Sequence, residues 1–266
     1  MKRIATAVVL IAALLPSLFF LPTVTWNIAC VFFAAICAYE WCRLCGLKGI
    51  LLSACIALIV SVVVAAVMDA IPAKWLFIAS TMTWIAAVPV IIWNNSQNIG
   101  KAVRIGFGGL IIASAASALA ALRSSDPALL LLLMAIVWVS DTAAYFSGRK
   151  WGHRKLAPSI SPGKTWEGVA GGLTAVCIYA LALIVSFPAT LPQTASRISE
   201  NSSALFMIVC LALAVAGIVG DLAESWAKRL AGVKDSGTIL PGHGGILDRV
   251  DALLPVLPMA ALIFLR

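Results

Sequence analysis

The chain has 266 residues, of which 62% are hydrophobic and only 11% are charged. Soluble globular domains average about 25% charged residues, so this composition excludes a soluble protein and indicates a polytopic membrane protein. Lys and Arg outnumber Asp and Glu by 19 to 11, but no soluble basic segment is present, so we expect no nucleic-acid partner.

The apolar residues are gathered into stretches that are long enough to cross a bilayer, which takes about 20 residues as a helix. The expected fold class is therefore all-α, with about nine transmembrane helices. The predicted spans cover residues 4–20, 23–41, 50–68, 75–93, 105–122, 128–147, 167–187, 204–226 and 247–265. Basic residues precede the first stretch, as in a signal peptide, but no cleavage site is evident, so we expect a retained first span.

The positive charges predict the orientation. With nine spans and the N-terminus inside, 15 of the 19 Lys and Arg residues face the cytoplasm. The remaining four are Lys74, Arg123, Arg197 and Arg266. The positive-inside rule therefore predicts an N-in, C-out protein of the inner (cytoplasmic) membrane. Loops 148–166 and 227–246 then face the cytoplasm.

The N-terminal part of the chain, residues 1–100, is interpreted as transmembrane scaffold because its spans contain few ionisable groups. Glu40 lies near the cytoplasmic end of the second span, and we expect it to form an interfacial salt bridge with Arg43. The seven cysteines lie mostly in apolar runs, and Cys42 and Cys45 form a CxxC with no second pair. We therefore expect neither a disulfide nor a zinc site.

The C-terminal part, residues 101–266, is interpreted as the catalytic region. Its first unusual residue is Asp141, one or two turns inside the cytoplasmic end of the sixth span. A carboxylate at that depth is costly, so it predicts either a polar cavity or a buried ion pair with another span. We favour a substrate site, because the loop that follows is itself unusual.

That loop, residues 149–167, contains five Lys or Arg residues and the turn that precedes the next helix. Gly163, Lys164 and Thr165 resemble the end of a P-loop, but Pro158 replaces the first glycine and no predicted strand precedes it. Ser161, Lys164 and Thr165 are nevertheless predicted to bind an anion at the start of the helix. The alternative is a positive-inside loop that contacts lipid phosphates.

The most polar stretch of the chain is 221–251, which contains five of its eleven acidic residues. Four of its side chains have the spacing i, i+3, i+4 and i+7, which places them on one helical face. They are Asp221, Glu224, Ser225 and Lys228. After a Gly-rich turn at 241–245, a further helix is predicted from about Ile246.

In that further helix, Asp248 and Asp251 are three residues apart on one face. Carboxylates repel phosphates unless a metal lies between them, so the stretch predicts a Mg²⁺ ion that is held by the carboxylates and binds a polyphosphate. Lys228, Arg229 and Arg249 would take up the remaining negative charge. The alternative is a charged cytoplasmic loop whose side chains are simply solvated.

Residues 225–251 also resemble the signature of the phosphatidate cytidylyltransferases, or CDP-diacylglycerol synthases. The matching positions are Ser225, Lys228, Arg229, Lys234, Asp235, Gly237, Leu240, Pro241, His243, Gly244, Gly245, Asp248, Arg249 and Asp251. The segments around Asp141 and around 161–166 resemble the same family. The resemblance covers roughly the C-terminal half, whereas the N-terminal half matches only in hydropathy.

The resemblance implies transfer of a cytidylyl group from CTP to phosphatidate, giving CDP-diacylglycerol and pyrophosphate in the bilayer. With the residue patterns it gives the predicted site. Catalytic residues are Asp221, Ser225, Lys228, Arg229, Asp248 and Arg249. Substrate-binding residues are Asp141, Ser161, Lys164, Thr165, Lys234, His243, Gly244 and Gly245. The ligands of Mg²⁺ are Asp221, Asp248, Glu224 and Asp251, and a second cation and a homodimer are left open.

Two other kinds of function remain open from the sequence. A CTP-dependent polyprenol kinase or an ether-lipid cytidylyltransferase would need similar polar groups. A transporter for an anionic solute would also place charges within helices, and such proteins often carry paired, broken spans in two halves. Here the charges are concentrated in the C-terminal half, which argues against transport.

Overall fold

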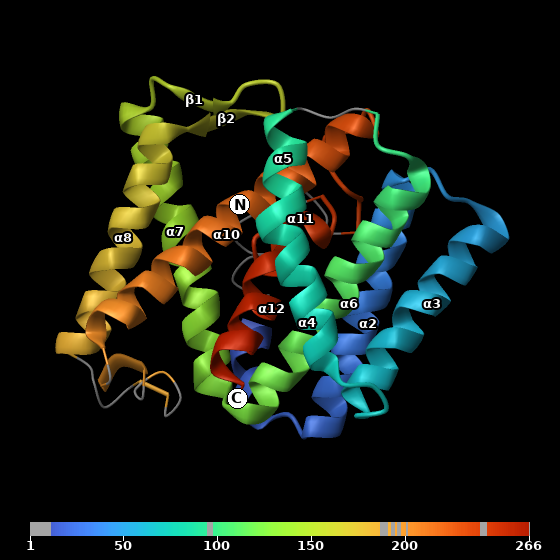
Figure 1. Cartoon of the computed structure of the whole chain (residues 1–266), viewed down its shortest axis with the longest axis horizontal. Helices are drawn as coiled ribbons and strands as arrows, with labels where there is room; N and C mark the ends of the chain where they lie inside the picture. The colour runs from blue at the N-terminus through green and yellow to red at the C-terminus, as the bar shows by residue number, and fades with distance from the viewer. Residues whose placement is uncertain are drawn as a thin grey trace.

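The computed structural model describes residues 12–94, 98–186, 191–192, 195, 198–200, 202–239 and 244–265. It is a bundle of long helices with a small β-hairpin at one end (Figure 1). Residues 12–20 are helical. The helices that follow are α2 (Thr23–Leu44), α3 (Gly49–Val67), α4 (Ala73–Met82), η1 (Thr83–Ala87), α5 (Val88–Trp93), α6 (Lys101–Ser125), α7 (Pro127–Trp151), α8 (Trp166–Val185), α10 (Ser203–Leu230), α11 (Leu247–Val250) and α12 (Leu253–Phe264).

Seven helical stretches among the described residues are long and apolar enough to cross a membrane, and α12 is a shorter apolar helix. The prediction of an all-α polytopic membrane protein is thereby confirmed. The number nine stays a prediction, since the expected first span begins in residues 1–11, outside the described part of the chain.

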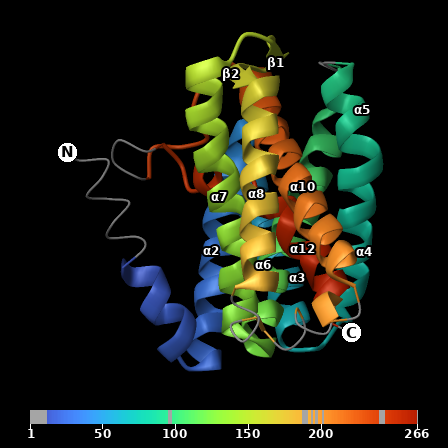
Figure 2. The same cartoon turned by 90° about the vertical axis from the view of Figure 1, so that its left-hand side faces the viewer.

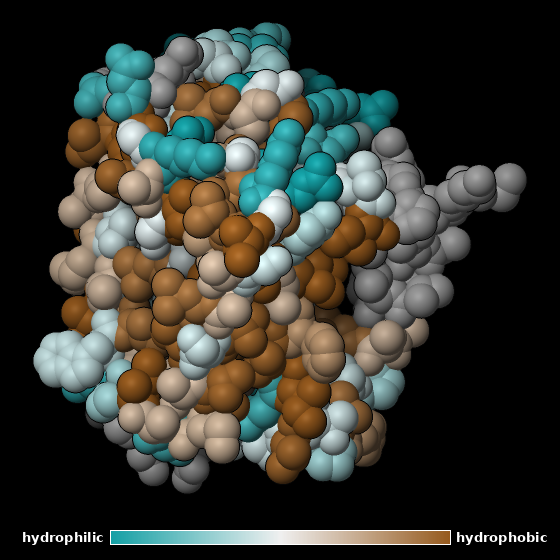
Figure 3. Space-filling model, turned by 90° about the vertical axis from the view of Figure 1, so that its right-hand side faces the viewer, coloured by the Kyte–Doolittle hydropathy of each residue, from teal (hydrophilic) through white to brown (hydrophobic). Residues whose placement is uncertain are grey.

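The surface has the character of a membrane protein. Hydrophobic side chains cover the middle of the face seen in Figure 3, and hydrophilic ones gather toward the end that carries the hairpin. Large apolar residues such as Phe32, Leu58 and Ile85 are exposed. Apolar surface on this scale requires a partner, which for long apolar helices is lipid.

Small residues let the helices approach closely. Gly108 of α6 has no side chain where the indole of Trp41 from α2 packs, and the Trp41 Nε1–H donates to the Arg104 carbonyl at 2.9 Å. On α8, Gly171 packs in the same way against Ser147 of α7. Figure 2 shows α7, α8 and α10 side by side below the hairpin.

The hairpin is a feature that the sequence did not predict. Strands β1 (Lys155–Ala157) and β2 (Ser161–Thr165) pair antiparallel, with Lys155 opposite Thr165. The Arg154 N–H donates to both carboxylate oxygens of Glu167 at 3.2 Å. The Thr165 hydroxyl caps α8 by accepting from the Gly168 N–H at 3.1 Å. These hydrogen bonds hold the loop at 149–167 in place between the end of α7 and the start of α8.

The ninth predicted span differs from expectation, because residues 247–265 form two helices rather than one. An uninterrupted helix would need an N–H at position 255 to donate to the Asp251 carbonyl, and Pro255 has none. That carbonyl accepts from the Leu254 N–H at 3.3 Å instead. Gly220 of α10 lies against it and against the Pro255 ring, where a Cβ would overlap both. The break leaves Asp251 between α11 and α12.

Helix α10 has 28 residues, which corresponds to about 42 Å, more than the roughly 30 Å of a bilayer core. It crosses the bundle at a steep tilt in Figure 1 and ends near the tops of α5 and α6. Its last turns, from Asp221 onward, therefore lie at the polar end of the bundle, beneath the hairpin and beside α11.

Candidate active site

A cavity of about 570 Å³ lies where α7, the hairpin, α10 and the segment 248–251 meet. Four stretches that are far apart in the sequence contribute predicted site residues to its lining. These residues are Asp141, Ser161, Lys164, Thr165, Asp221, Asp248, Arg249 and Asp251. The tertiary structure thus gathers carboxylates and cations around one space at the polar end of the bundle.

The first charged pair of the cavity joins the hairpin to α10. The Lys164 ammonium lies 2.7 Å from the Asp221 carboxylate, and their side chains are 24% and 33% exposed. The Ser225 hydroxyl, one turn along α10, donates to the other oxygen of Asp221 at 3.4 Å. This pair is open to the cavity, so a ligand can reach both of its charges.

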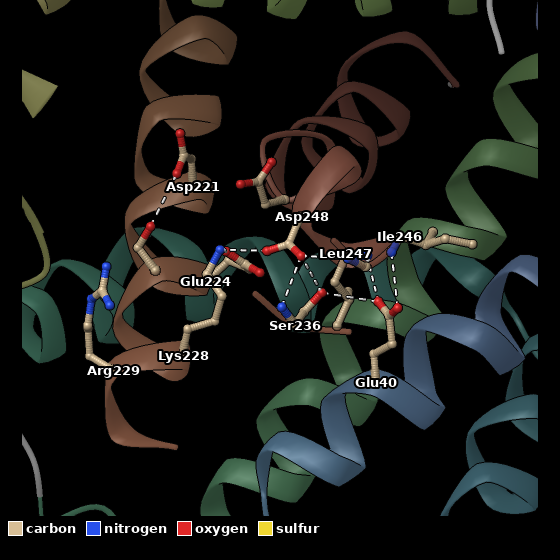
Figure 4. Close-up of polar contacts among 12 residues, drawn as sticks. Glu40, Asp221, Glu224, Lys228, Arg229, Ser236, Ile246, Leu247 and Asp248 are labelled. Carbon is tan, nitrogen blue, oxygen red and sulfur yellow. Dashed lines mark hydrogen bonds and ion pairs between the residues drawn. The ribbon is translucent and has the colours of Figure 1, made fainter. Parts of the chain in front are cut away.

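A second charged cluster lies deeper, around Lys228 (Figure 4). Its ammonium is 2.5 Å from a Glu224 oxygen and 2.6 Å from Asp248 Oδ1. The three side chains are only 13%, 2% and 5% exposed, in the order Lys228, Glu224 and Asp248. The predicted helical face is confirmed, since Glu224 and Lys228 are paired at i, i+4 on α10.

Asp248 is held from both sides. Its Oδ2 accepts from the Ser236 N–H and hydroxyl, each at 2.9 Å, and from the Gly245 N–H at 2.7 Å. Burial alone would raise the pKa of Asp248, but the hydrogen bonds from Lys228 and from these N–H groups outweigh it and lower the pKa to about 2. Asp248 is therefore ionised at neutral pH, as a metal ligand has to be.

Asp251 lies between α11 and α12 and faces the same cavity. Burial, and then the negative charge of Asp221, raise the pKa of Asp251 above its usual range. Two carboxylates that oppose each other's ionisation in one cavity form a place that favours a cation. Among the described residues, no three His, Cys, Asp or Glu side chains form a complete metal cage. Mg²⁺ does not need one, because one or two carboxylates, waters and substrate phosphates suffice. The donor set fits it.

Comparison with known proteins decides the family. The model of the cytidylyltransferase family matches residues 1–265. The chain belongs to the cytidylyltransferase family. A protein named phosphatidate cytidylyltransferase from Pseudomonas aeruginosa is 35% identical over 267 residues, which is 98% of this chain and 95% of that protein. Proteins with the same name from Haemophilus influenzae and Brucella suis are 45% and 42% identical over 130 and 153 residues, about half of each chain.

The family match confirms the resemblance seen in the signature and extends it. From the sequence, the N-terminal half resembled the cytidylyltransferases only in hydropathy, whereas the match covers both halves. The family match therefore includes the helices interpreted as scaffold as well as the residues that line the cavity.

Several predicted site residues of this cytidylyltransferase are not among the described residues that line the cavity. The Arg229 Nε–H donates to the Ile160 carbonyl at 3.2 Å, which ties the end of α10 to the hairpin. Lys234 is exposed on the loop after α10. Gly244 has φ +80°, a backbone conformation that suits glycine, and lies against Asp248. His243 lies outside the described residues. Their roles in substrate binding stay predictions.

The sequence interpretation missed two residues, Glu40 and Ser236. The salt bridge expected between Glu40 and Arg43 is not among the ion pairs of the described residues, and Arg43 donates to the Tyr39 hydroxyl at 3.0 Å instead. Glu40 turns into the protein, toward the loop that holds Asp248, and is 1% exposed. The available signal was a single carboxylate within an apolar span, which by itself indicates a functional role.

Proposed function

We propose that this protein is an integral-membrane phosphatidate cytidylyltransferase, which makes CDP-diacylglycerol and pyrophosphate from CTP and phosphatidate. The observation that carries the proposal is the cavity, where carboxylates and cations from the signature segments converge at the polar end of an apolar bundle. The names of the relatives support the choice of substrates. Acyl chains can stay in lipid while the head group meets CTP in this polar space.

The chemistry requires little from a general base. The phosphate oxygen of phosphatidate is already anionic at neutral pH and attacks the α-phosphorus of CTP. A new bond forms between this oxygen and the α-phosphorus. The bond between the α-phosphorus and the oxygen that bridges it to the β-phosphorus breaks, and pyrophosphate leaves with the electron pair. The main task is to bring polyanions together, and Lys164, Arg249 and Arg149 line the cavity with positive charge.

We propose that Asp221 and Asp248 hold Mg²⁺, with Asp251 beside them. Each of the two aspartates is paired with a lysine ammonium, at 2.7 Å and 2.6 Å, so each already faces a positive charge. When bound, Mg²⁺ supplies charge neutralisation for the phosphates of CTP. Glu224 faces Lys228 and not the cavity, which supports a role in orienting Lys228 toward Asp248.

We propose that the cavity faces the cytoplasm from the inner membrane. In support, the cations of the hairpin and the cavity lie at one end of the bundle, and the positive-inside rule assigns that end to the cytoplasm. A reporter fused after Arg266 is expected to lie outside the cytoplasm. A cytoplasmic reporter signal from a functional fusion would reverse this orientation.

The test is turnover by the purified protein in lipid nanodiscs with CTP, Mg²⁺ and phosphatidate. We expect CDP-diacylglycerol and pyrophosphate in equal amounts, with Asp221→Asn as the inactive control. A polyprenol kinase would release CDP and phosphorylate a polyprenol, and an ether-lipid enzyme would prefer an ether phosphatidate. Uptake of an anion into proteoliposomes with no turnover of CTP would support a transporter instead and refute the proposal.

A further inference from the structure

A buried carboxylate outside the cavity connects the N-terminal helices to the segment that carries Asp248. Glu40 lies in the last turns of α2 and is 1% exposed. It is not among the described residues that line the active-site cavity. A buried carboxylate is costly unless its oxygens are fully hydrogen-bonded, so its partners indicate why it is there.

The partners of Glu40 are the first N–H groups of α11. Glu40 Oε1 accepts from the Ile246 N–H at 3.1 Å, and Oε2 accepts from the Leu247 N–H at 2.9 Å. The N-terminal N–H groups of a helix have no partner within it, and no side chain of the adjoining Ile246 caps α11. Glu40 therefore supplies the cap from the other half of the chain (Figure 4).

Ser236 joins Glu40 to Asp248. Its hydroxyl lies 3.2 Å from Glu40 Oε2 and 2.9 Å from Asp248 Oδ2, so its single proton is shared between the two carboxylates. Its backbone N–H also donates to Asp248 at 2.9 Å. The two segments that flank Asp248, at Ser236 and at 246–247, therefore both donate hydrogen bonds to Glu40.

Two glycines make room for this carboxylate. A Cβ at Gly237 or at Gly245 would overlap the Glu40 carboxylate, and at Gly245 it would also overlap the Ser236 hydroxyl. The Gly245 N–H donates to Asp248 at 2.7 Å. Gly245 therefore leaves space for the Glu40 carboxylate and also orients Asp248. A change in the packing around Glu40 is expected to change the position of Asp248 as well.

We propose that Glu40 is a positioning residue for the active site: by holding Ser236 and the start of α11, it fixes the direction in which the Asp248 carboxylate points. Its effect on catalysis rests on the proposed function, whereas its effect on the loop does not. A misplacement of a reacting group by about 1 Å can cost about a hundredfold in rate, so loss of this anchor is expected to affect turnover.

The test compares Glu40→Gln with Tyr39→Phe, a neighbour on α2 that loses only an exposed hydroxyl and its hydrogen bond from Arg43. Glutamine keeps the shape of Glu40 but places an NH₂ group where one N–H needs an acceptor. We expect kcat to fall about tenfold, as loss of a hydrogen bond to a charged group predicts. The KM values for CTP and phosphatidate should change little. Hydrogen exchange of the Ser236, Gly245 and Leu247 amides should accelerate in Glu40→Gln and stay unchanged in Tyr39→Phe.

Gly245→Ala disturbs the same contacts, because the added Cβ would overlap the Glu40 carboxylate and the Ser236 hydroxyl. It is the second variant to measure if Glu40→Gln folds poorly. We expect it to reproduce the loss of kcat and the faster exchange, with the double variant little worse than either single one. Wild-type exchange and wild-type kcat in Glu40→Gln would overturn the proposal. If the wild-type protein makes no CDP-diacylglycerol, the proposed function fails, and the exchange comparison still decides whether Glu40 holds the loop.

Discussion

The site contains two aspartate–lysine pairs that look alike in distance and differ in surroundings. Lys164 and Asp221 are 2.7 Å apart with side chains 24% and 33% exposed, and they join the hairpin to α10 across the open cavity. Lys228 and Asp248 are 2.6 Å apart with side chains 13% and 5% exposed, and Glu224 shares the same ammonium.

In the Lys164–Asp221 pair, a ligand can reach both charges, whereas the Lys228–Asp248 pair fixes the orientation of Asp248 at the cavity lining. An exposed ion pair contributes little to stability and exchanges partners readily, so an incoming phosphate can take Lys164 and a cation can take Asp221. A buried pair whose oxygens accept further hydrogen bonds is costly to break. Asp248 is therefore kept in one orientation while Asp221 stays free to respond to substrate.

The largest effects are expected from Asp221→Asn and Asp248→Asn, which keep the side-chain shape and remove the charge. Each should lower kcat by about a hundredfold or more, with the double variant little worse, because ligands of one site act as a unit. Only Asp248→Asn should also lower the melting temperature. Mg²⁺ should raise the melting temperature of the wild-type protein and of neither variant. Near wild-type turnover at saturating Mg²⁺ in either single variant would refute the metal assignment.

The next comparison is between the two lysines. Lys228→Met leaves the buried Glu224 and Asp248 without their shared cation, and we expect it to lower the free energy of unfolding by about 3–5 kcal/mol. Lys164→Met should change it by less than about 1 kcal/mol. Lys164→Met should instead lower kcat/KM through weaker binding of substrate phosphates. Thermal melting in detergent, with steady-state kinetics, measures both. Equal losses of stability would show that the two pairs do not differ as their burial indicates.

The smallest effect is expected from Arg229→Lys, which removes the Nε–H that bonds the Ile160 carbonyl at 3.2 Å. A single hydrogen bond contributes about 1 kcal/mol, so kcat/KM should fall by about fivefold as the hairpin loosens. Hydrogen exchange of residues 155–165 should accelerate. The control is Arg154→Lys, because the hairpin uses the backbone N–H and carbonyl of Arg154. A loss of several hundredfold in Arg229→Lys would instead support direct contact of Arg229 with substrate.

Local patterns were enough to predict several features. The apolar stretches predicted the spans, because a bilayer imposes length and composition on each helix separately. The i, i+4 spacing predicted that Glu224 and Lys228 share a face, and the structure pairs them at 2.5 Å. The hairpin at 155–165 escaped prediction, since three- and five-residue strands rich in Lys, Pro and Gly carry no strand pattern.

The sequence by itself determined that this is an all-α membrane protein of the cytidylyltransferase family and which residue types its site contains, since these follow from composition and from one contiguous signature. The tertiary structure alone decided which partner each charged side chain contacts. Lys164 meets Asp221 across 57 positions of sequence, and Glu40 reaches Leu247 across 207. Such pairings depend on how tilted helices pack, which no local periodicity records, so a carboxylate expected at the interface instead holds the loop around Asp248.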